Sequence, residues 1–231
     1  MKLFLILILT LSAYLSSQDY LDYPHPYHST ETTKGMVVSQ NYLSSDIGAE
    51  ILSKGGNAVD AAIAVGFSLT ATLPRAGNIG GGGFMLVYDK KTESIISFDF
   101  RSMSPKLATP DVYKVNGVHQ YELSEEGYKA IAVPGTVAGL IEAHEMFGTM
   151  DLADLVNPTI ELLKEGVPVT DDLYWAINDT ESLKKDPESK KIYLADEVIR
   201  GGKLFIEDLI KTMELIRDCL LYTSPSPRDV H

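Results

Sequence analysis

The chain has 231 residues, of which 45% are hydrophobic and 23% are charged, a composition typical of a folded globular protein. Its 32 acidic and 20 basic residues give a net charge of -12, which argues against nucleic acid as a partner, because basic surface is what binds a phosphate backbone. With Cys219 as the single cysteine, no internal disulfide can form.

The N-terminus has the order of a secretory signal peptide. Lys2 precedes the apolar segment 3–15, and two small serines follow that segment. The segment is shorter than the roughly 20 apolar residues of a membrane-spanning helix, so we expect residues 1–17 to be a cleaved signal peptide. The expected location is therefore secreted, periplasmic or extracellular. The alternative is an uncleaved signal anchor that holds the protein on a membrane.

Residues 18–34 are polar and interrupted by two prolines, which predicts an extended lead-in to a compact part that begins near Gly35. His25 and His28 lie in this lead-in. No further ligand stands at a suitable spacing from them, which favours a surface segment over a metal site.

A short strand and two helices are expected at the start of the compact part. Residues 36–39 (MVVS) have the β-branched character of a strand. Ser44 is a candidate N-cap for a helix that ends at a pair of glycines. Asn57 is the candidate N-cap of a second helix, 58–73, with Asp60 in its first turn. Because this helix is small or apolar nearly all the way round, we expect it to be buried.

The next elements are strands by composition. The polar turn 89–93 separates residues 84–88 (FMLVY) from residues 94–100 (SIISFDF), which predicts an antiparallel hairpin. The first of these strands barely alternates between polar and apolar residues. We therefore expect it to be covered on both faces.

The remaining part of the chain is mainly helical in pattern. The expected helices cover 137–147, 159–164 with Pro158 at the first helical position, a stretch capped by Thr170, and 206–217. Helices on both sides of a hairpin indicate a layered mixed core of the α/β (α+β) class. Residues 219–231 have no amphipathic period and resemble the translation of foreign DNA, so we expect a core of 35–218 and a non-native tail. A natural disordered tail is the alternative.

Four consecutive glycines, 80–83, lead into the first strand of the hairpin. They match neither GxGxxG nor GxxxxGK, and a strand follows them instead of a helix N-terminus, which counts against a phosphate-binding loop. We interpret them as a turn that needs close backbone contact beneath the buried helix.

Other catalytic patterns are weak. No GxSxG elbow of a serine hydrolase occurs, and Ser68 lies inside the apolar helix as a core hydroxyl. Neither His119 nor His144 lies near an obvious nucleophile in the sequence. Spacing gives no reason to pair any carboxylates, so capping or solvated roles are expected for them. The carboxylates considered are Asp60, Asp99, Glu142 and Glu145.

Arg101 differs from the other charged residues because it ends a strongly apolar strand. A guanidinium in that position can form a bidentate pair with a carboxylate, which belongs either to the protein or to a ligand. The residues alone favour the internal pair.

Four motifs occur in a characteristic order: GGNAVDAA (55–62), GNIGGGGFM (77–85), DFR (99–101) and PGTVAGL (134–140). In this order and spacing they resemble the large subunit of the gamma-glutamyltranspeptidases, also called glutathione hydrolases. The resemblance covers about residues 35–218.

The resemblance implies an N-terminal-nucleophile hydrolase fold, a four-layer αββα sandwich made by two chains that arise from one self-cleaved precursor. This chain would be the large-subunit half. The implied reaction transfers a γ-glutamyl group from glutathione or another γ-glutamyl compound to water, to an amino acid or to a dipeptide. The family's nucleophile is a threonine at the N-terminus of the small subunit, with its own amine as base. No metal or organic cofactor is implied.

The resemblance also implies a role for Arg101, which matches the arginine that binds the α-carboxylate of the donor and so orients the γ-carboxyl group. The threonine nucleophile is expected in the small subunit, because the Thr32–Thr33 pair here precedes the core and is followed by Lys34. We therefore expect these residues alone to be inactive. The alternatives are a related acylase, such as a cephalosporin acylase, and a noncatalytic secreted binding protein that keeps the Arg101 pocket.

Overall fold

The structure is a computed structural model that describes residues 31–194 and 198–219. The chain divides into two units, Met1–Lys34 and Gly35–His231. The expected signal peptide, most of the expected lead-in with its two histidines, and nearly all of the expected tail lie outside the described residues. Within the described ranges, no helix combines the length and the apolar character needed to span a bilayer.

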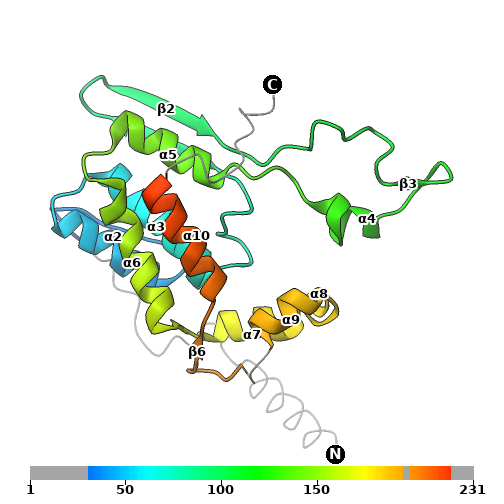
Figure 1. The fold of residues 1–231 in the computed structure, drawn as a ribbon. Coiled ribbons are helices and arrows are strands. Elements are labelled where there is room, and N and C mark those ends of the chain that lie inside the picture. The colour runs from blue at the N-terminus through cyan, green and yellow to red at the C-terminus, as the bar shows by residue number, and fades with distance from the viewer. Residues whose placement is uncertain (1–30, 195–197, 220–231) are drawn as a thin grey trace, which may run out of the picture. The chain divides into compact units, whose positions relative to one another are not determined.

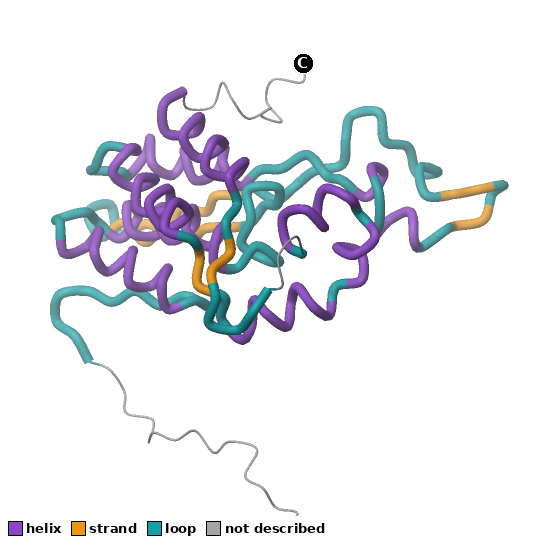
Figure 2. Tube along the Cα trace, turned by 60° about the horizontal axis from the view of Figure 1, so that its bottom comes forward, coloured by secondary structure: helices purple, strands orange, loops and turns teal. Residues whose placement is uncertain are grey.

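Most of the regular secondary structure in the described residues is helical, and the strands are short (Figures 1 and 2). The longer helices are α2 (Tyr42–Ser53), α3 (Ala58–Thr72), α5 (Thr136–Phe147), α6 (Leu152–Glu165) and α10 (Glu207–Cys219). The shorter ones are α4 (Glu122–Glu125), η1 (Tyr128–Ala130), α7 (Asp171–Asp179), α8 (Glu181–Lys185) and α9 (Pro187–Tyr193). Three antiparallel pairs are formed by β1 (Phe84–Asp89) with β2 (Ser94–Asp99), β3 (Lys114–Val115) with β4 (Val118–His119), and β5 (Val167–Pro168) with β6 (Lys203–Leu204).

Helix α3 lies at the centre of the core. It contacts α2, α5 and α6, and α6 in turn contacts α10 (Figure 1). Ile63, Ala64 and Phe67 are fully buried, as expected for a helix with small or apolar residues on all sides. The side chain of Asn57 accepts hydrogen bonds from the backbone N–H groups of Val59 and Asp60, so the predicted N-cap is confirmed.

The predicted strand at 36–39 is wrong. These residues pair with no strand in the described part of the chain, and Val38 is 81% exposed. The backbone N–H of Ser39 donates instead to Ser45 Oγ in α2, at 2.9 Å. A side chain of the next helix therefore satisfies the backbone group that a neighbouring strand would have bonded.

Helix α2 begins earlier than the sequence predicts. Its N-cap is Asn41, whose side chain accepts from Leu43 N at 2.9 Å. Ser44 lies in the first turn and is fully buried, and its hydroxyl shares a hydrogen bond of 2.8 Å with Thr72 Oγ1 of α3. The expected capping serine thus joins two helices instead.

Helix α6 also begins earlier than predicted, and Pro158 lies inside it. A proline within a helix removes one backbone hydrogen bond. The residues before the proline bury Leu152, Leu155 and Val156, and this apolar face keeps the helix continuous through Pro158. The predictions of α5, of α10 and of the Thr170 cap on α7 are confirmed to within two residues.

The β1–β2 hairpin is confirmed, with a register that runs from Phe84 opposite Asp99 to Asp89 opposite Ser94. One face packs on the core through Met85, Val87, Ile96 and Phe98, and the Phe98 ring meets the Phe147 ring of α5 edge-on at 6.2 Å. The other face is open: the exposed fractions are 68% for Phe84, 74% for Leu86, 62% for Tyr88 and 71% for Ile95. The cover that the sequence predicts for this second face of β1 is therefore not provided by the described residues of this chain.

Candidate functional site

Three segments that carry sequence motifs meet at the open end of the β1–β2 hairpin. We call this region the glycine junction and define it as residues 78–83, 99–103 and 133–139. Its first link continues the hairpin ladder beyond the strands. Phe100 N donates to Gly83 O at 3.1 Å, and Gly83 N donates to Phe100 O at 3.3 Å.

Two further links bring in the segment that begins α5. Met103 and Val133 exchange both backbone hydrogen bonds, at 3.1 and 2.8 Å. The carbonyl oxygen of Gly81 accepts from Gly135 N at 2.8 Å and from Thr136 N at 3.2 Å. The backbone of each segment is therefore tied directly to at least one of the others.

The glycines allow this close approach. A Cβ atom at Gly82 would lie 2.5 Å from the carbonyl oxygen of Phe100 and even nearer to Ser102 N. No side chain fits between these backbone groups. The sequence predicts a packing role for the glycines, but it gives no sign that the segment packed against Gly82 is the one that carries Arg101.

The Phe100 ring lies against Gly139 of α5, where a Cβ atom would overlap the ring. Its carbonyl group faces Gly135 just as closely. Phe100 is therefore held by residues of the two other segments, through its ring and through its backbone. Since Phe100 directly precedes Arg101, this packing fixes where the arginine leaves the hairpin.

Arg101 lies between two anchored residues, Phe100 and Met103. Its own backbone N–H donates to Asp99 Oδ1 at 3.0 Å. The Arg101 side chain is exposed. The junction thus presents an exposed arginine side chain from a backbone that hydrogen bonds fix on either side.

Within the described residues, the Arg101 guanidinium makes no ion pair. The other three described arginines each pair with an aspartate: Arg75 with Asp172 at 2.6 Å, Arg200 with Asp171 at 3.6 Å and Arg217 with Asp218 at 2.6 Å. The internal partner that the residues alone favour for Arg101 is not found in these ranges. As far as the described residues are concerned, the guanidinium N–H donors are open to a carboxylate ligand.

Ser68, His119 and His144 have partners other than Arg101. Ser68 is fully buried and donates to Val65 O at 2.9 Å, which confirms it as a core hydroxyl. His144 Nε2 lies 2.7 Å from Met150 O, and the exposed ring of His119 meets Tyr113. No group of three or more His, Cys, Asp or Glu side chains in the described part of the chain could hold a metal ion.

Asp60 is fully buried and stabilises the fold. It accepts from Asn57 N at 2.9 Å, from Thr149 N at 3.0 Å, and from the Thr149 hydroxyl at 2.5 Å. Burial alone would raise the pKa of its carboxyl group, but these hydrogen bonds, with one from Met150 N, together lower the pKa below 3.8. The sequence predicts the helix cap but not this link to the loop between α5 and α6.

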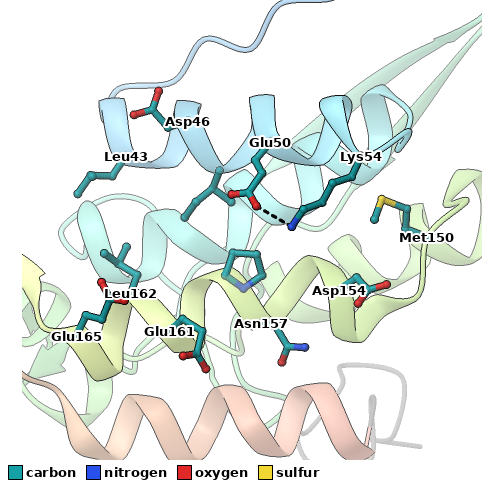
Figure 3. Close-up of a pocket in the computed structure, with 12 residues that line it drawn as sticks. Leu43, Asp46, Glu50, Lys54, Met150, Asp154, Asn157, Glu161, Leu162 and Glu165 are labelled. Atoms are coloured by element: carbon teal, nitrogen blue, oxygen red, sulfur yellow. Dashed lines mark ion pairs between the residues drawn. The ribbon is translucent and has the colours of Figure 1, made fainter.

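A groove lies between α2 and α6 (Figure 3). Its charged lining is mostly acidic, and its one lysine, Lys54, pairs with Glu50 at 2.7 Å. The other carboxylates are Asp46, Asp154, Glu161 and Glu165. No residue of the glycine junction lines this groove, and its charge disfavours an anionic ligand. Arg101 therefore remains the candidate for binding a carboxylate.

Known proteins are similar to this chain in sequence and in fold. The profile of the family Gamma-glutamyltranspeptidase matches residues 44–219. A glutathione hydrolase proenzyme of Bacillus subtilis is 41% identical over 187 residues, which are 79% of this chain and 32% of that protein. The chain thus spans about a third of the length of the curated relatives that it matches.

Solved structures agree with this match. The gamma-glutamyltranspeptidase of Helicobacter pylori superposes with a TM-score of 0.81 at 35% identity, over 85% of this chain and 57% of that one. A cephalosporin acylase from Bacillus halodurans superposes with a TM-score of 0.73 at 27% identity, over 87% of this chain and 39% of that one. These likenesses confirm the predicted N-terminal-nucleophile hydrolase fold class. The chain belongs to the gamma-glutamyltranspeptidase family.

Proposed function

We propose that this chain is the N-terminal part of an enzyme that transfers the γ-glutamyl group of glutathione, or of a related γ-glutamyl compound, to water or to an amino acid or dipeptide. The observation that carries the proposal is Arg101. Arg101 makes no ion pair with the described residues. It extends from the glycine junction, where segments of three family motifs are joined by backbone hydrogen bonds. The complete protein is this chain together with the remaining length that its relatives have.

The role of Arg101 is to bind the α-carboxylate of the donor. A guanidinium holds a carboxylate through two parallel N–H···O bonds, which fixes the orientation of the donor as well as its position. The γ-carbonyl group is then directed away from Arg101, toward the nucleophile. Because the junction fixes the backbone before binding, little conformational freedom of the main chain is lost when the donor binds.

The nucleophile belongs to the remaining part of the complete protein. A threonine hydroxyl there attacks the γ-carbonyl carbon, the amide C–N bond breaks, and the amine leaves with a proton. Water or the amine of an acceptor then attacks the γ-glutamyl ester and releases the threonine. This chain contributes binding and orientation to both steps, and by itself it does not catalyse them.

The small subunit covers the open face of the β1–β2 hairpin. Phe84, Leu86, Tyr88 and Ile95 form an apolar row on this face, and a row of this kind is buried when a second sheet packs on it. In the complete protein, Leu86→Lys should prevent the two chains from purifying together. Glu93→Lys, in the exposed turn of the same hairpin, is the control. Normal assembly of the Leu86→Lys variant would contradict this interface.

The protein is exported, as the charged and apolar order of its first 17 residues suggests. N-terminal sequencing of the mature protein tests this step. A mature chain that begins after residue 17 supports export with cleavage, whereas one that begins at Met1 and remains in the cytoplasm contradicts it.

The activity is tested with a chromogenic γ-glutamyl amide and the complete protein. Arg101→Ala should raise the donor KM by about 100-fold, because it removes two charge-assisted hydrogen bonds. Arg101→Lys should raise it by about tenfold, since a lysine keeps the charge but not the bidentate geometry. Arg75→Ala is the matched control, because Arg75 is exposed and pairs with Asp172.

An unchanged KM in Arg101→Ala would remove the assigned role. Equal turnover of an acyl amide that lacks an α-carboxylate would favour an acylase instead.

A further inference from the structure

We propose that Asp99 is a positioning residue for Arg101, which it controls through the backbone without neutralising the guanidinium. This inference rests on the proposed function, in which Arg101 binds the α-carboxylate of the donor. Its basis is one contact: Asp99 Oδ1 accepts a hydrogen bond of 3.0 Å from Arg101 N. An aspartate that accepts from the N–H two residues later forms an Asx turn, which fixes the backbone in between.

This turn lies where the hairpin ladder ends. Phe100 makes both of its backbone hydrogen bonds with Gly83. Successive residues of a strand point their N–H groups to opposite sides, so the N–H of Arg101 points away from Gly83. Without Asp99, no group of the hairpin ladder would accept a hydrogen bond from this N–H. The Asp99 carboxylate therefore provides the first hydrogen bond beyond the ladder.

The turn also explains how a carboxylate and a guanidinium lie two residues apart without pairing. Within the described residues, Asp99 and Arg101 form no salt bridge, and the carboxylate accepts from the backbone N–H of Arg101. An Asp99 side chain bound to the guanidinium would compete with the donor carboxylate for the same N–H groups. Held in the turn, the Asp99 carboxylate leaves the guanidinium open to the donor and orients the backbone of Arg101.

The same hairpin supplies a matched control at its other end. Asp89 Oδ1 accepts from Lys91 N at 2.9 Å, again two residues later, and Asp89 Oδ2 accepts from the Thr92 hydroxyl at 2.8 Å. Asp89 is the last residue of β1, next to the exposed turn, and lies outside the glycine junction. Removing it breaks the same type of turn without moving Arg101.

The experiment compares Asp99→Ala, Asp99→Asn and Asp89→Ala in the complete protein, with the γ-glutamyl amide as donor. Asp99→Ala should raise the donor KM about tenfold with a smaller change in kcat, because binding loses an oriented arginine. Asp99→Asn keeps a carbonyl acceptor and should stay within about twofold of the wild type. Asp89→Ala should leave both constants unchanged. Hydrogen exchange should show faster exchange of the Arg101 amide in Asp99→Ala only.

Two results would overturn the inference. One is an unchanged KM in Asp99→Ala while Arg101→Ala still raises it, which leaves the proposed function intact. The other is an Asp99→Asn variant as impaired as Asp99→Ala, because then the charge matters and the turn does not. If Arg101→Ala itself has no effect, the proposed function fails first. Should Asp99→Ala not fold, Asp99→Ser replaces it, and its weaker turn should give an intermediate KM.

Discussion

The two ends of the β1–β2 hairpin use the same local device in different surroundings. At the turn end, Asp89 accepts the N–H of Lys91, and its partners all lie within the exposed turn. At the open end, Asp99 accepts the N–H of Arg101, but the neighbouring backbone is also enclosed by residues from two other segments of the chain. The turn end therefore depends on local sequence alone, whereas the open end depends on the whole core.

This difference explains why an arginine at the open end can be functional. Both ends are exposed, and both carry charged residues. At the open end, long-range contacts restrict the backbone on each side of Arg101, so the backbone that carries its guanidinium is held in a defined place. Within the described residues, the backbone that carries a charged side chain in the turn has no such long-range contacts. Changes at the open end should accordingly cost more stability than changes at the turn end.

The largest effect is expected for Gly82→Ala. Its Cβ atom would meet the backbone of Phe100 and Ser102, which cannot move without disturbing the junction. Overpacking of this kind should destabilise the complete protein by roughly 3 kcal/mol, visible as a lower midpoint of thermal unfolding.

The matched control is Gly81→Ala. A Cβ atom at Gly81 would lie 3.5 Å from Asn78 Oδ1, which is an ordinary van der Waals distance. Its thermal midpoint should stay close to that of the wild type. If the two alanine variants unfold at the same temperature, close packing at Gly82 is not what holds the open end together.

A smaller effect is expected for Asp60, a third carboxylate that accepts backbone N–H groups, but in a fully buried place. Asp60→Ala leaves these donors without a partner and should cost about 2 kcal/mol of stability. The pKa of Asp60 is lowered in the folded protein, so its contribution is present above the ordinary value of 3.8 and is lost as the pH falls through the folded pKa.

Thermal unfolding at a series of pH values measures this contribution. The difference between wild type and Asp60→Asn, which cannot ionise, should be largest near neutral pH and should shrink as the pH falls below about 4. A difference that stays constant down to the lowest pH would show that the ionised form of Asp60 adds nothing to stability.

The smallest effect is expected in the turn, where Glu93 has a φ of 53°. A side chain in the left-handed region costs about 1 kcal/mol, and glycine relieves this cost but has more freedom to lose on folding. Glu93→Gly should therefore raise the free energy of unfolding by roughly 0.5 kcal/mol, measured by denaturant titration. A clear loss of stability would mean that contacts of the Glu93 side chain hold the turn.

The same contrast separates what the sequence predicts from what it does not. The Asn57 cap, helix α3 and the hairpin turn depend on neighbouring residues, and local patterns predict them correctly. The contact of Gly82 with Ser102 and that of Phe100 with Gly139 join residues far apart in the chain. A local sequence pattern cannot predict contacts between such distant residues.

Two other features show the same limit of local patterns. Pro158 indicates a helix start by its local preference, yet the packing of Leu155 and Val156 keeps it inside α6. The apolar residues of β1 indicate cover on both faces, but Leu86 is 74% exposed within the described residues. For the site, the motif order points to Arg101, whereas no sequence pattern predicts that Arg101 makes no ion pair in the described ranges or that Asp99 forms a turn with it.

The most direct test is a crystal structure of the complete protein with L-glutamate bound. We expect both α-carboxylate oxygens to accept N–H bonds from the Arg101 guanidinium at about 2.7–2.9 Å, with Asp99 still bonded to the Arg101 backbone. A glutamate whose α-carboxylate is held by other residues, with Arg101 turned away into solvent, would contradict it.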